Sequence, residues 1–275
     1  MALLFTPALR KEYLRLFTTT KVRPQHAAEA KQIADALFAQ RARYESAGHP
    51  IGVPWWMVAV IHSLEASRNF NAHLHNGDPL AHRTVHVPKN RPLGVPPFTW
   101  EESARDALTQ VGFASVADWS ISSALFRLEG YNGTGYRGRG INTPYLWSFS
   151  QHYAKGKFAS DGRFDPSLVS QQCGAGVLLR ILVDEGRVKT LPSKPAKGGP
   201  SVPFPGRVLK LRKPLMSGED VHAFQARMHT LGLPIAPDGQ YGEQSKRVTG
   251  RFQTARGLTA DGIVGEQTWN AAFTD

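Results

Sequence analysis

From residue 8 to residue 186, the pattern of apolar and polar positions predicts a chain that is mainly helical. The strongest segment follows Pro54, which suits the first turn of a helix, and it is apolar on nearly every side as far as Leu64. Because such a helix has no polar face for water, we expect it to be buried. Further helices are predicted over residues 25–46, 104–111, 118–128 and 171–183.

Thr99 and Glu102 have the spacing of a capping box just before the 104–111 segment. Glycine-rich and aromatic loops separate the predicted helices. The chain has no alternating strand and helix pattern, no glycine-rich phosphate motif and no Gly-x-Ser-x-Gly elbow. Nucleotide-binding and serine-hydrolase functions therefore have no support in the sequence.

Near the C-terminus the chain repeats itself, since residues 238–245 return as residues 261–268 with a period of 23. Each copy predicts a tight Asp-Gly turn, a second glycine, and a Ser or Thr that opens a short helix. A preceding helix carries Val221, Phe224 and Met228 at helical spacing. Residues 214–275 are therefore predicted to form a small three-helix domain.

Composition adds a domain organisation to this pattern. A length of 275 residues with 41% hydrophobic content is enough for about two domains. The net charge of +11 is concentrated in residues 187–218, which hold eight basic side chains, six prolines and no acidic residue. We therefore predict a domain over residues 1–186, a semi-rigid basic linker over 187–213 and a second domain over 214–275.

The basic linker suits a polyanionic partner, and both nucleic acid and an anionic cell envelope meet that description. The single cysteine, Cys173, rules out an intrachain disulfide and cysteine-rich zinc sites. No apolar run approaches the length of a bilayer span, and the start of the chain lacks the pattern of a signal peptide. We expect synthesis in a cytoplasm and no insertion into a membrane.

The C-terminal repeat resembles the peptidoglycan-binding domain of many wall hydrolases. The matching blocks are Glu219-Asp220-Val221, Phe224-Gln225, Leu231-Gly232, Asp238-Gly239-x-Tyr241-Gly242, Phe252-Gln253, Gly257-Leu258 and Asp261-Gly262-Ile263-Val264-Gly265-x-x-Thr268-Trp269. The resemblance implies docking on peptidoglycan through a groove near Asp238, Gly239, Tyr241, Asp261 and Gly262. The alternative is that the Asp-Gly pairs only form turns, and the large aromatic residues are expected in the core.

The main catalytic candidate is Glu65, at the end of the apolar helix. A carboxyl group that is partly desolvated keeps its proton to higher pH, as a general acid for a glycosidic oxygen must. The alternative is an ion pair between Glu65 and Arg68, three residues further on. Glu129 is a second candidate acid, although it could instead pair with Arg127 or cap the turn at Gly130.

Glu65-x-Ser67-x-x-Phe70-Asn71 resembles the lysozyme-like peptidoglycan hydrolases, including lytic transglycosylases. The segment 128–133 is similar to their Tyr-Asn-Gly segment, which implies that Tyr131 and Asn132 line a sugar cleft. The Gly-Leu-Met-Gln sequence of the transglycosylases does not follow the acid. The architecture resembles a phage-type endolysin, with a lysozyme-like helical catalytic domain first and the three-helix wall-binding domain last.

A histidine-rich segment follows the candidate acid, with His73, His75, Asp78, His82 and His86 within fourteen positions. We favour a cleft-lining loop in which Asp78 is a second catalytic residue that either positions water or stabilises positive charge on the sugar, while His75 and Asn76 bind substrate. The alternative is a zinc amidase or peptidase acting on the stem peptide. No His-Glu-x-x-His motif is present, and no metal site is predicted.

The prediction is therefore a monomeric muramidase of the endolysin type, which cleaves glycan strands of bacterial peptidoglycan with Glu65 as general acid. No cofactor and no specific nucleic-acid partner are expected, and the enzyme would act on the wall after release from the cytoplasm. The alternatives are a lytic transglycosylase using the same glutamate, a zinc enzyme on the stem peptide, and a wall-binding protein without activity.

Overall fold

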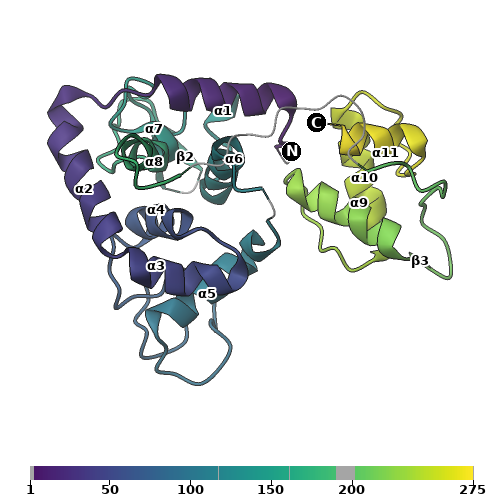
Figure 1. Ribbon diagram of the computed structural model, residues 1–275, viewed down its shortest axis with the longest axis horizontal. Helices are drawn as coiled ribbons and strands as arrows, with labels where there is room; N and C mark the ends of the chain where they lie inside the picture. The colour runs from purple at the N-terminus through teal and green to yellow at the C-terminus, as the bar shows by residue number, and fades with distance from the viewer. Residues whose placement is uncertain (1–2, 117, 161, 190–201, 275) are drawn as a thin grey trace. The chain divides into compact units, whose positions relative to one another are not determined.

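The computed structural model describes residues 3–116, 118–160, 162–189 and 202–274 (Figure 1). Contacts divide the chain into two compact units. The larger comprises Glu12–Pro192, and the smaller comprises Ser193–Asp275 together with Met1–Lys11. Both units are built mainly from helices, so the predicted mainly α fold class is confirmed. Among the described helices, none is long and apolar enough to cross a lipid bilayer.

The larger unit is a cluster of α-helices with one short hairpin. Its helices are α1 (Pro7–Thr19, from Glu12 onward), α2 (Ala27–Ala39), α3 (Arg41–Gly48), α4 (Trp55–Glu65), α5 (Trp100–Gln110), α6 (Ile121–Asn132), α7 (Pro144–Trp147) and α8 (Ala175–Asp184). Short 3-10 turns lie at Pro24–His26, His49–Ile51, Phe113–Ser115 and Arg137–Arg139. Strands β1 (Lys157–Ser160) and β2 (Arg163–Asp165) pair antiparallel.

Helix α4 is the central element of this unit. Every residue from Trp55 to Leu64 is buried, and the helix packs against α2, α3 and α8. Burial of each large side chain contributes roughly 1.5–3 kcal/mol, which explains why an apolar sequence of this kind occupies the core. The predicted buried helix is confirmed, except that Pro54 has extended backbone angles and caps the helix instead of forming its first turn.

The helix predicted over residues 25–46 is wrong as a single element. The chain turns at Gln40 (φ −98°, ψ 13°) and separates α2 from α3. This turn lets α2 pack on α8 while α3 packs on both α4 and α5, so each helix buries its own apolar face. Tertiary packing thus overrides a continuous helical pattern here.

Two other predicted helices begin later than expected. Helix α6 starts at Ile121 and α8 at Ala175, after the extended residue Gly174. A Cβ atom at Gly174 would lie 2.4 Å from the Leu146 carbonyl, so only glycine permits this close approach of α8 to α7. By contrast, the capping box at α5 is confirmed, since Thr99 Oγ1 accepts from Glu102 N at 3.2 Å and the Glu102 carboxylate accepts from Thr99 N at 2.8 Å.

The smaller unit contains the three predicted helices, α9 (Glu219–Thr230), α10 (Glu243–Ala255) and α11 (Glu266–Phe273). Strands β3 (Met216–Ser217) and β4 (Gln240–Tyr241) pair antiparallel beside them. Phe224, Phe252 and Trp269 fill its core, as expected. Leu4 belongs to the same core cluster, a contribution from the start of the chain that the sequence did not predict.

The predicted linker over residues 187–213 is described only at its two ends. Val188 is buried in the larger unit, and Leu209 is buried in the smaller unit, where it forms a β-bridge with Val264. The central part, residues 190–201, lies outside the described residues. The linker therefore stays a prediction.

Candidate functional site

The candidate acid Glu65 is the last residue of α4, where the chain makes an abrupt reversal. The amides of Ala66 and Arg68 both donate to the His62 carbonyl, at 3.2 and 3.1 Å. Ser67 and Arg68 adopt left-handed backbone angles, with φ of 49° and 66°. Non-glycine residues in this region cost free energy and concentrate at functional sites, so the turn after Glu65 is a strained feature that the surrounding packing maintains.

The carboxyl group of Glu65 accepts a hydrogen bond of 2.8 Å from the hydroxyl of Tyr145. One side of the Glu65 side chain is open to solvent. Burial of the rest raises the pKa of the Glu65 carboxyl above its ordinary value, and the bond from Tyr145 partly opposes this shift. A carboxyl that is both reachable and slow to lose its proton has the properties of a general acid.

Two tyrosines from distant segments surround this carboxyl. Burial raises the pKa of both the Tyr131 and the Tyr145 hydroxyls, and the nearby charge of Glu65 raises them further. Tyr131 is half-buried at the end of α6, whereas its neighbour Asn132 is exposed. The structure therefore brings Tyr131 together with Glu65. Tyr145 was not predicted as the partner of the acid, and its one sequence signal is its place in an aromatic segment after Pro144.

The alternative ion pair between Glu65 and Arg68 is absent from the described residues. Arg68 instead directs its guanidinium toward Ser63 Oγ, at 3.4 Å. The turn with left-handed Ser67 and Arg68 carries the arginine away from the position that an uninterrupted helix would give it. Glu65 thus keeps a neutral hydrogen-bond partner, which is consistent with its raised pKa.

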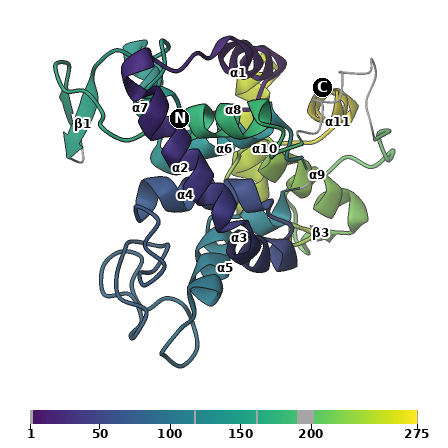
Figure 2. The same ribbon diagram turned by 60° about the vertical axis from the view of Figure 1, so that its left-hand side comes forward.

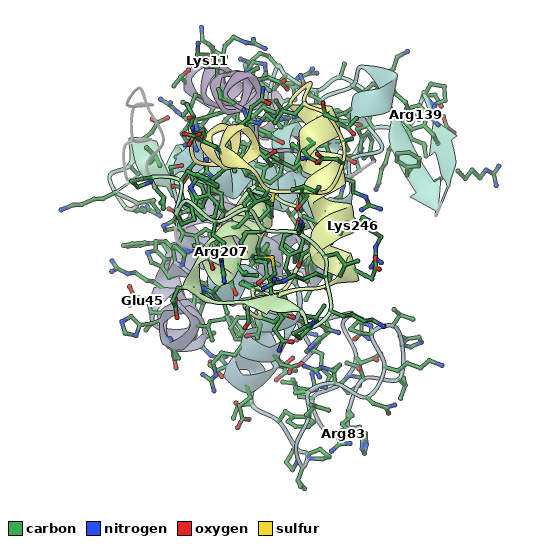
Figure 3. All side chains as sticks on the ribbon, turned by 90° about the vertical axis from the view of Figure 1, so that its right-hand side faces the viewer. Lys11, Glu45, Arg83, Arg139, Arg207 and Lys246 are labelled. Atoms are coloured by element: carbon green, nitrogen blue, oxygen red, sulfur yellow. The ribbon has the colours of Figure 1, made fainter. Side chains whose placement is uncertain are left out.

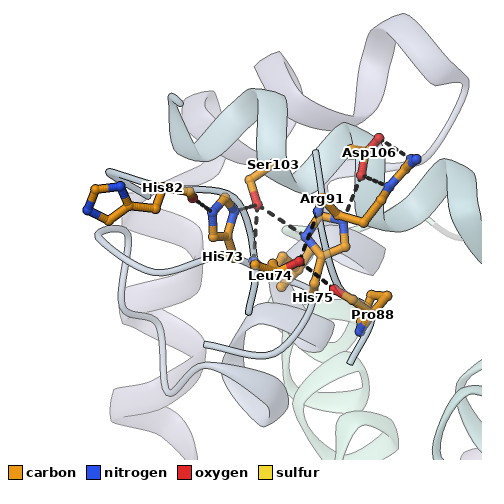
Figure 4. Close-up of polar contacts among 9 residues, drawn as sticks. His73, Leu74, His75, His82, Pro88, Arg91, Ser103 and Asp106 are labelled. Carbon is orange, nitrogen blue, oxygen red and sulfur yellow. Dashed lines mark hydrogen bonds and ion pairs between the residues drawn. The ribbon is translucent and has the colours of Figure 1, made fainter. Parts of the chain in front are cut away.

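The histidine-rich segment lies in the long connection between α4 and α5, residues 66–99, called the α4–α5 loop below. Figure 4 shows that two of its histidines fasten the loop to α5. His73 bonds Ser103 Oγ at 2.8 Å and the His82 carbonyl at 2.7 Å. His75 bonds Asp106 at 2.8 Å, and its side chain is almost fully buried. His75 thus helps to hold the loop on α5, and its predicted contact with substrate stays a prediction.

Asp78 also acts within the loop. One carboxylate oxygen accepts from the backbone amides of Val85 and His86, at 2.8 and 3.0 Å, and the other pairs with the His86 ring at 2.6 Å. Burial alone would raise the pKa of Asp78, but these hydrogen bonds outweigh it and hold the pKa below its usual range. Because both oxygens are engaged, this environment favours a structural role over the predicted positioning of water.

Asn76 supports the same turn, since its side-chain oxygen accepts from the Asp78 amide at 3.0 Å. Its Nδ2 atom is buried without a hydrogen-bond partner among the described residues. Substrate binding by Asn76 stays a prediction. Within the described parts of the chain, no three His, Cys, Asp or Glu side chains converge in an arrangement that could hold a metal ion.

Glu129, the second candidate acid, is a buried structural residue. It accepts a hydrogen bond of 2.7 Å from Tyr13 and forms an ion pair with Arg137 at 2.7 Å. Arg137 also pairs with Glu12 at 2.9 Å, beside a cavity of about 210 Å³. Glu129 is thus paired with Arg137, and both oxygens of its carboxylate have partners.

In the smaller unit, a buried glutamine organises each copy of the repeat. Gln225 donates to Asp238 at 2.8 Å and accepts from the Gly239 amide at 2.8 Å. Gln253 makes the same pair of bonds with Asp261 and Gly262, at the same distances. Both glycines have positive φ, 73° and 70°, which the turn requires. The Asp-Gly pairs therefore have a structural role, signalled in the sequence by the recurring Phe-Gln.

Tyr241 lies in the core of the smaller unit. Its side chain is fully buried, and its hydroxyl bonds Thr249 Oγ1 at 2.6 Å and the Gly262 carbonyl at 3.0 Å. Tyr241 thus links the two turns, and its predicted contact with peptidoglycan stays a prediction. Contacts of the polymer with Asp238, Gly239, Asp261 and Gly262 stay predictions.

Comparison with known proteins identifies the smaller unit. Residues 217–272 match the peptidoglycan binding domain family PG_binding_1. The chain therefore carries a peptidoglycan-binding domain at its C-terminal side, and that part of the resemblance is confirmed. The match covers only the smaller unit.

Two curated relatives are enzymes. The chain is 29% identical over 131 residues to an N-acetylmuramoyl-L-alanine amidase, CwlL, of Bacillus licheniformis, which covers 41% of this chain and 36% of the relative. It is 43% identical over 60 residues to a zinc D-Ala-D-Ala carboxypeptidase of Streptomyces albus G. This second match covers 21% of this chain and 24% of the relative. The chain thus spans about a third or less of these relatives. No solved structure matches it significantly.

Proposed function

We propose that this protein is a peptidoglycan glycosidase of the muramidase type, in which Glu65 is the general acid and residues 217–272 hold the enzyme on its polymer. The observation that carries the proposal is the Glu65 carboxyl, placed at the end of a buried helix with a raised pKa and one open side. A wall-binding domain increases the local concentration of glycan strands around this group.

In the proposed reaction, the protonated Glu65 donates its proton to the glycosidic oxygen as the bond to the sugar breaks. Tyr145 bonds one carboxyl oxygen and thereby leaves the other free to carry the proton toward the substrate. Tyr131 and Asn132 would contact the sugar, and the effect of the Glu65 charge on the pKa of Tyr131 supports that role for the tyrosine. Water then attacks the sugar carbon, gives a proton back to the Glu65 carboxylate and leaves a reducing end. In the transglycosylase alternative, a hydroxyl of the substrate attacks instead and leaves an anhydro end.

A second candidate function is cleavage of the stem peptide, because the relatives include an amidase and a zinc carboxypeptidase. The histidines that would supply zinc ligands are engaged with Ser103, Asp106 and a backbone carbonyl, so the geometry of the loop favours the glycosidase.

Mass spectrometry of purified peptidoglycan after digestion tests the proposal. The expected products are muropeptides with intact stem peptides and reducing ends. Anhydro ends would select the transglycosylase reaction. Released peptides with intact glycan would contradict the glycosidase and support the second candidate, while binding without any product would identify a wall-binding protein only.

A further inference from the structure

The α4–α5 loop exposes four large aliphatic side chains. Val85, Val87, Leu93 and Val95 are 64%, 82%, 71% and 87% exposed. The other exposed large hydrophobic residues of the described chain are at most 47% exposed. Single exposed aliphatics need no explanation, but four on one loop form an apolar surface that costs free energy in water and marks an interaction site.

This exposure does not come from a loosely held loop. Thr84 is buried, and its hydroxyl donates to the Pro88 carbonyl and accepts from the Arg91 amide. Its backbone amide donates to the Arg91 carbonyl, and its backbone carbonyl accepts from the Asn90 amide. Asp78 binds the amides of Val85 and His86, as described above. The Arg83 guanidinium donates to the Gly94 carbonyl at 3.0 Å and so joins the two limbs. The loop extends away from the helices in Figures 1 and 2. Its own hydrogen bonds hold the backbone that carries the exposed aliphatic residues.

The charged side chains of the outer part of the loop, after Asp78, are all basic. Residues 79–100 contain no aspartate or glutamate, while they hold Arg83, Lys89 and Arg91. Arg91 is paired with Asp106 of α5. Arg83 and Lys89 remain exposed, and Figure 3 shows Arg83 among the outward side chains of this loop. The surface therefore combines exposed aliphatic side chains with two exposed cations.

We propose that the α4–α5 loop binds the surface of an anionic lipid bilayer. Aliphatic side chains enter the boundary between headgroups and acyl chains, while cations beside them contact lipid phosphates, so the two features of this loop match the two layers of such a surface. Binding of this kind is peripheral and reversible, and no segment crosses the membrane. The proposal goes beyond the proposed glycosidase activity and does not depend on it.

Sedimentation of the full chain with lipid vesicles tests this assignment. Vesicles of phosphatidylcholine with phosphatidylglycerol should retain the protein, and vesicles of phosphatidylcholine alone should retain it weakly. Val87→Ser together with Val95→Ser should lower partitioning to the anionic vesicles by about tenfold or more, because each buried valine adds up to roughly that factor. Lys89→Gln should lower partitioning to the anionic vesicles about fivefold, because one cation near such a surface contributes about 1 kcal/mol.

Matched variants separate the loop from the general basic charge of the chain. Val111→Ser changes an equally aliphatic residue that is 47% exposed outside the loop, and Lys155→Gln removes an exposed charge elsewhere in the same unit. Both should leave vesicle binding unchanged. Thermal unfolding of each variant verifies that the fold is retained.

Three results would overturn the assignment. The first is vesicle binding that the loop variants do not reduce beyond their controls. The second is loss of binding to lipid-free peptidoglycan in the loop variants, which would make the polymer the partner. The third is concentration-dependent self-association that the loop variants abolish, which would make the partner a second copy of the chain.

Discussion

The hydroxyl of Tyr145 donates a 2.8 Å hydrogen bond to the carboxyl of Glu65, although 80 residues separate the two in the chain. Tyr145 lies on α7, which Gly174 allows to pack closely against the start of α8. Glu65 ends the buried helix α4, which packs on α8 as well. The geometry of the candidate acid therefore depends on how three helices meet.

Replacing Glu65 by glutamine should abolish most of the lytic activity, because removal of a general acid costs on the order of a hundred- to ten-thousand-fold in rate. The melting temperature at pH 7 should not fall, since burial disfavours the ionised carboxylate that the variant removes. Turbidity loss of a cell-wall suspension measures the activity. Glu45→Gln, which breaks only the exposed pair with Arg41, serves as the control. An active Glu65→Gln enzyme would contradict the assignment.

Tyr145→Phe should change the pH dependence of the reaction. The tyrosine hydroxyl favours the ionised carboxylate, so its removal raises the pKa of Glu65 further. A general acid works below its pKa, and the alkaline limb of the kcat/KM profile should therefore move to higher pH while the maximum rate falls. Tyr131→Phe, for which the structure gives no such bond, should leave the limb in place. A limb that moves to lower pH would refute the proposed coupling.

Asp78→Asn should loosen the α4–α5 loop more than it affects catalysis. The low pKa of Asp78 reflects hydrogen bonds that stabilise the fold above the ordinary carboxyl pKa and are lost as the pH falls through the lowered value. Hydrogen exchange at the amides of Val85 and His86 should accelerate in the variant at neutral pH. If activity instead fell as far as in Glu65→Gln with unchanged exchange, Asp78 would be a catalytic residue.

Gln253→Ala should destabilise the smaller unit and weaken binding to peptidoglycan. It removes the bonds to Asp261 and Gly262 and leaves the buried Gly262 amide unpaired, at a cost of roughly 1–3 kcal/mol. Thermal unfolding of the full chain and sedimentation with purified peptidoglycan measure the two effects. Gln244→Ala, at an exposed position on the same helix, should change neither. Equal melting temperatures for both variants would show that the buried glutamine is dispensable.

Activity should survive treatment with EDTA, because the proposed acid is a carboxyl group that requires no ion. The assay is the same turbidity measurement, repeated after removal of the chelator. Loss of activity that zinc restores would move the reaction to a metal site and favour cleavage of the stem peptide.

The sequence by itself determined the features that arise from neighbouring residues. The apolar run before Glu65 predicts the buried helix α4, and the spacing of Thr99 and Glu102 predicts the capping box of α5. The repeated Asp-Gly pairs predict the turns of the peptidoglycan-binding domain. In each case the decisive interaction spans a few positions, so the order of residues is enough to reveal it.

Only the tertiary structure decided which side chains meet. It placed Tyr145 on Glu65, Arg137 on Glu129 and Ser103 on His73, and it buried Tyr241 between the two turns of the smaller unit. It also showed that two residues of the histidine-rich segment, His73 and His75, bond to helix α5. The aliphatic residues of the same loop are exposed to solvent. These contacts depend on how helices from distant segments pack, and helical periodicity specifies which face of a helix is buried but not which helix will cover it.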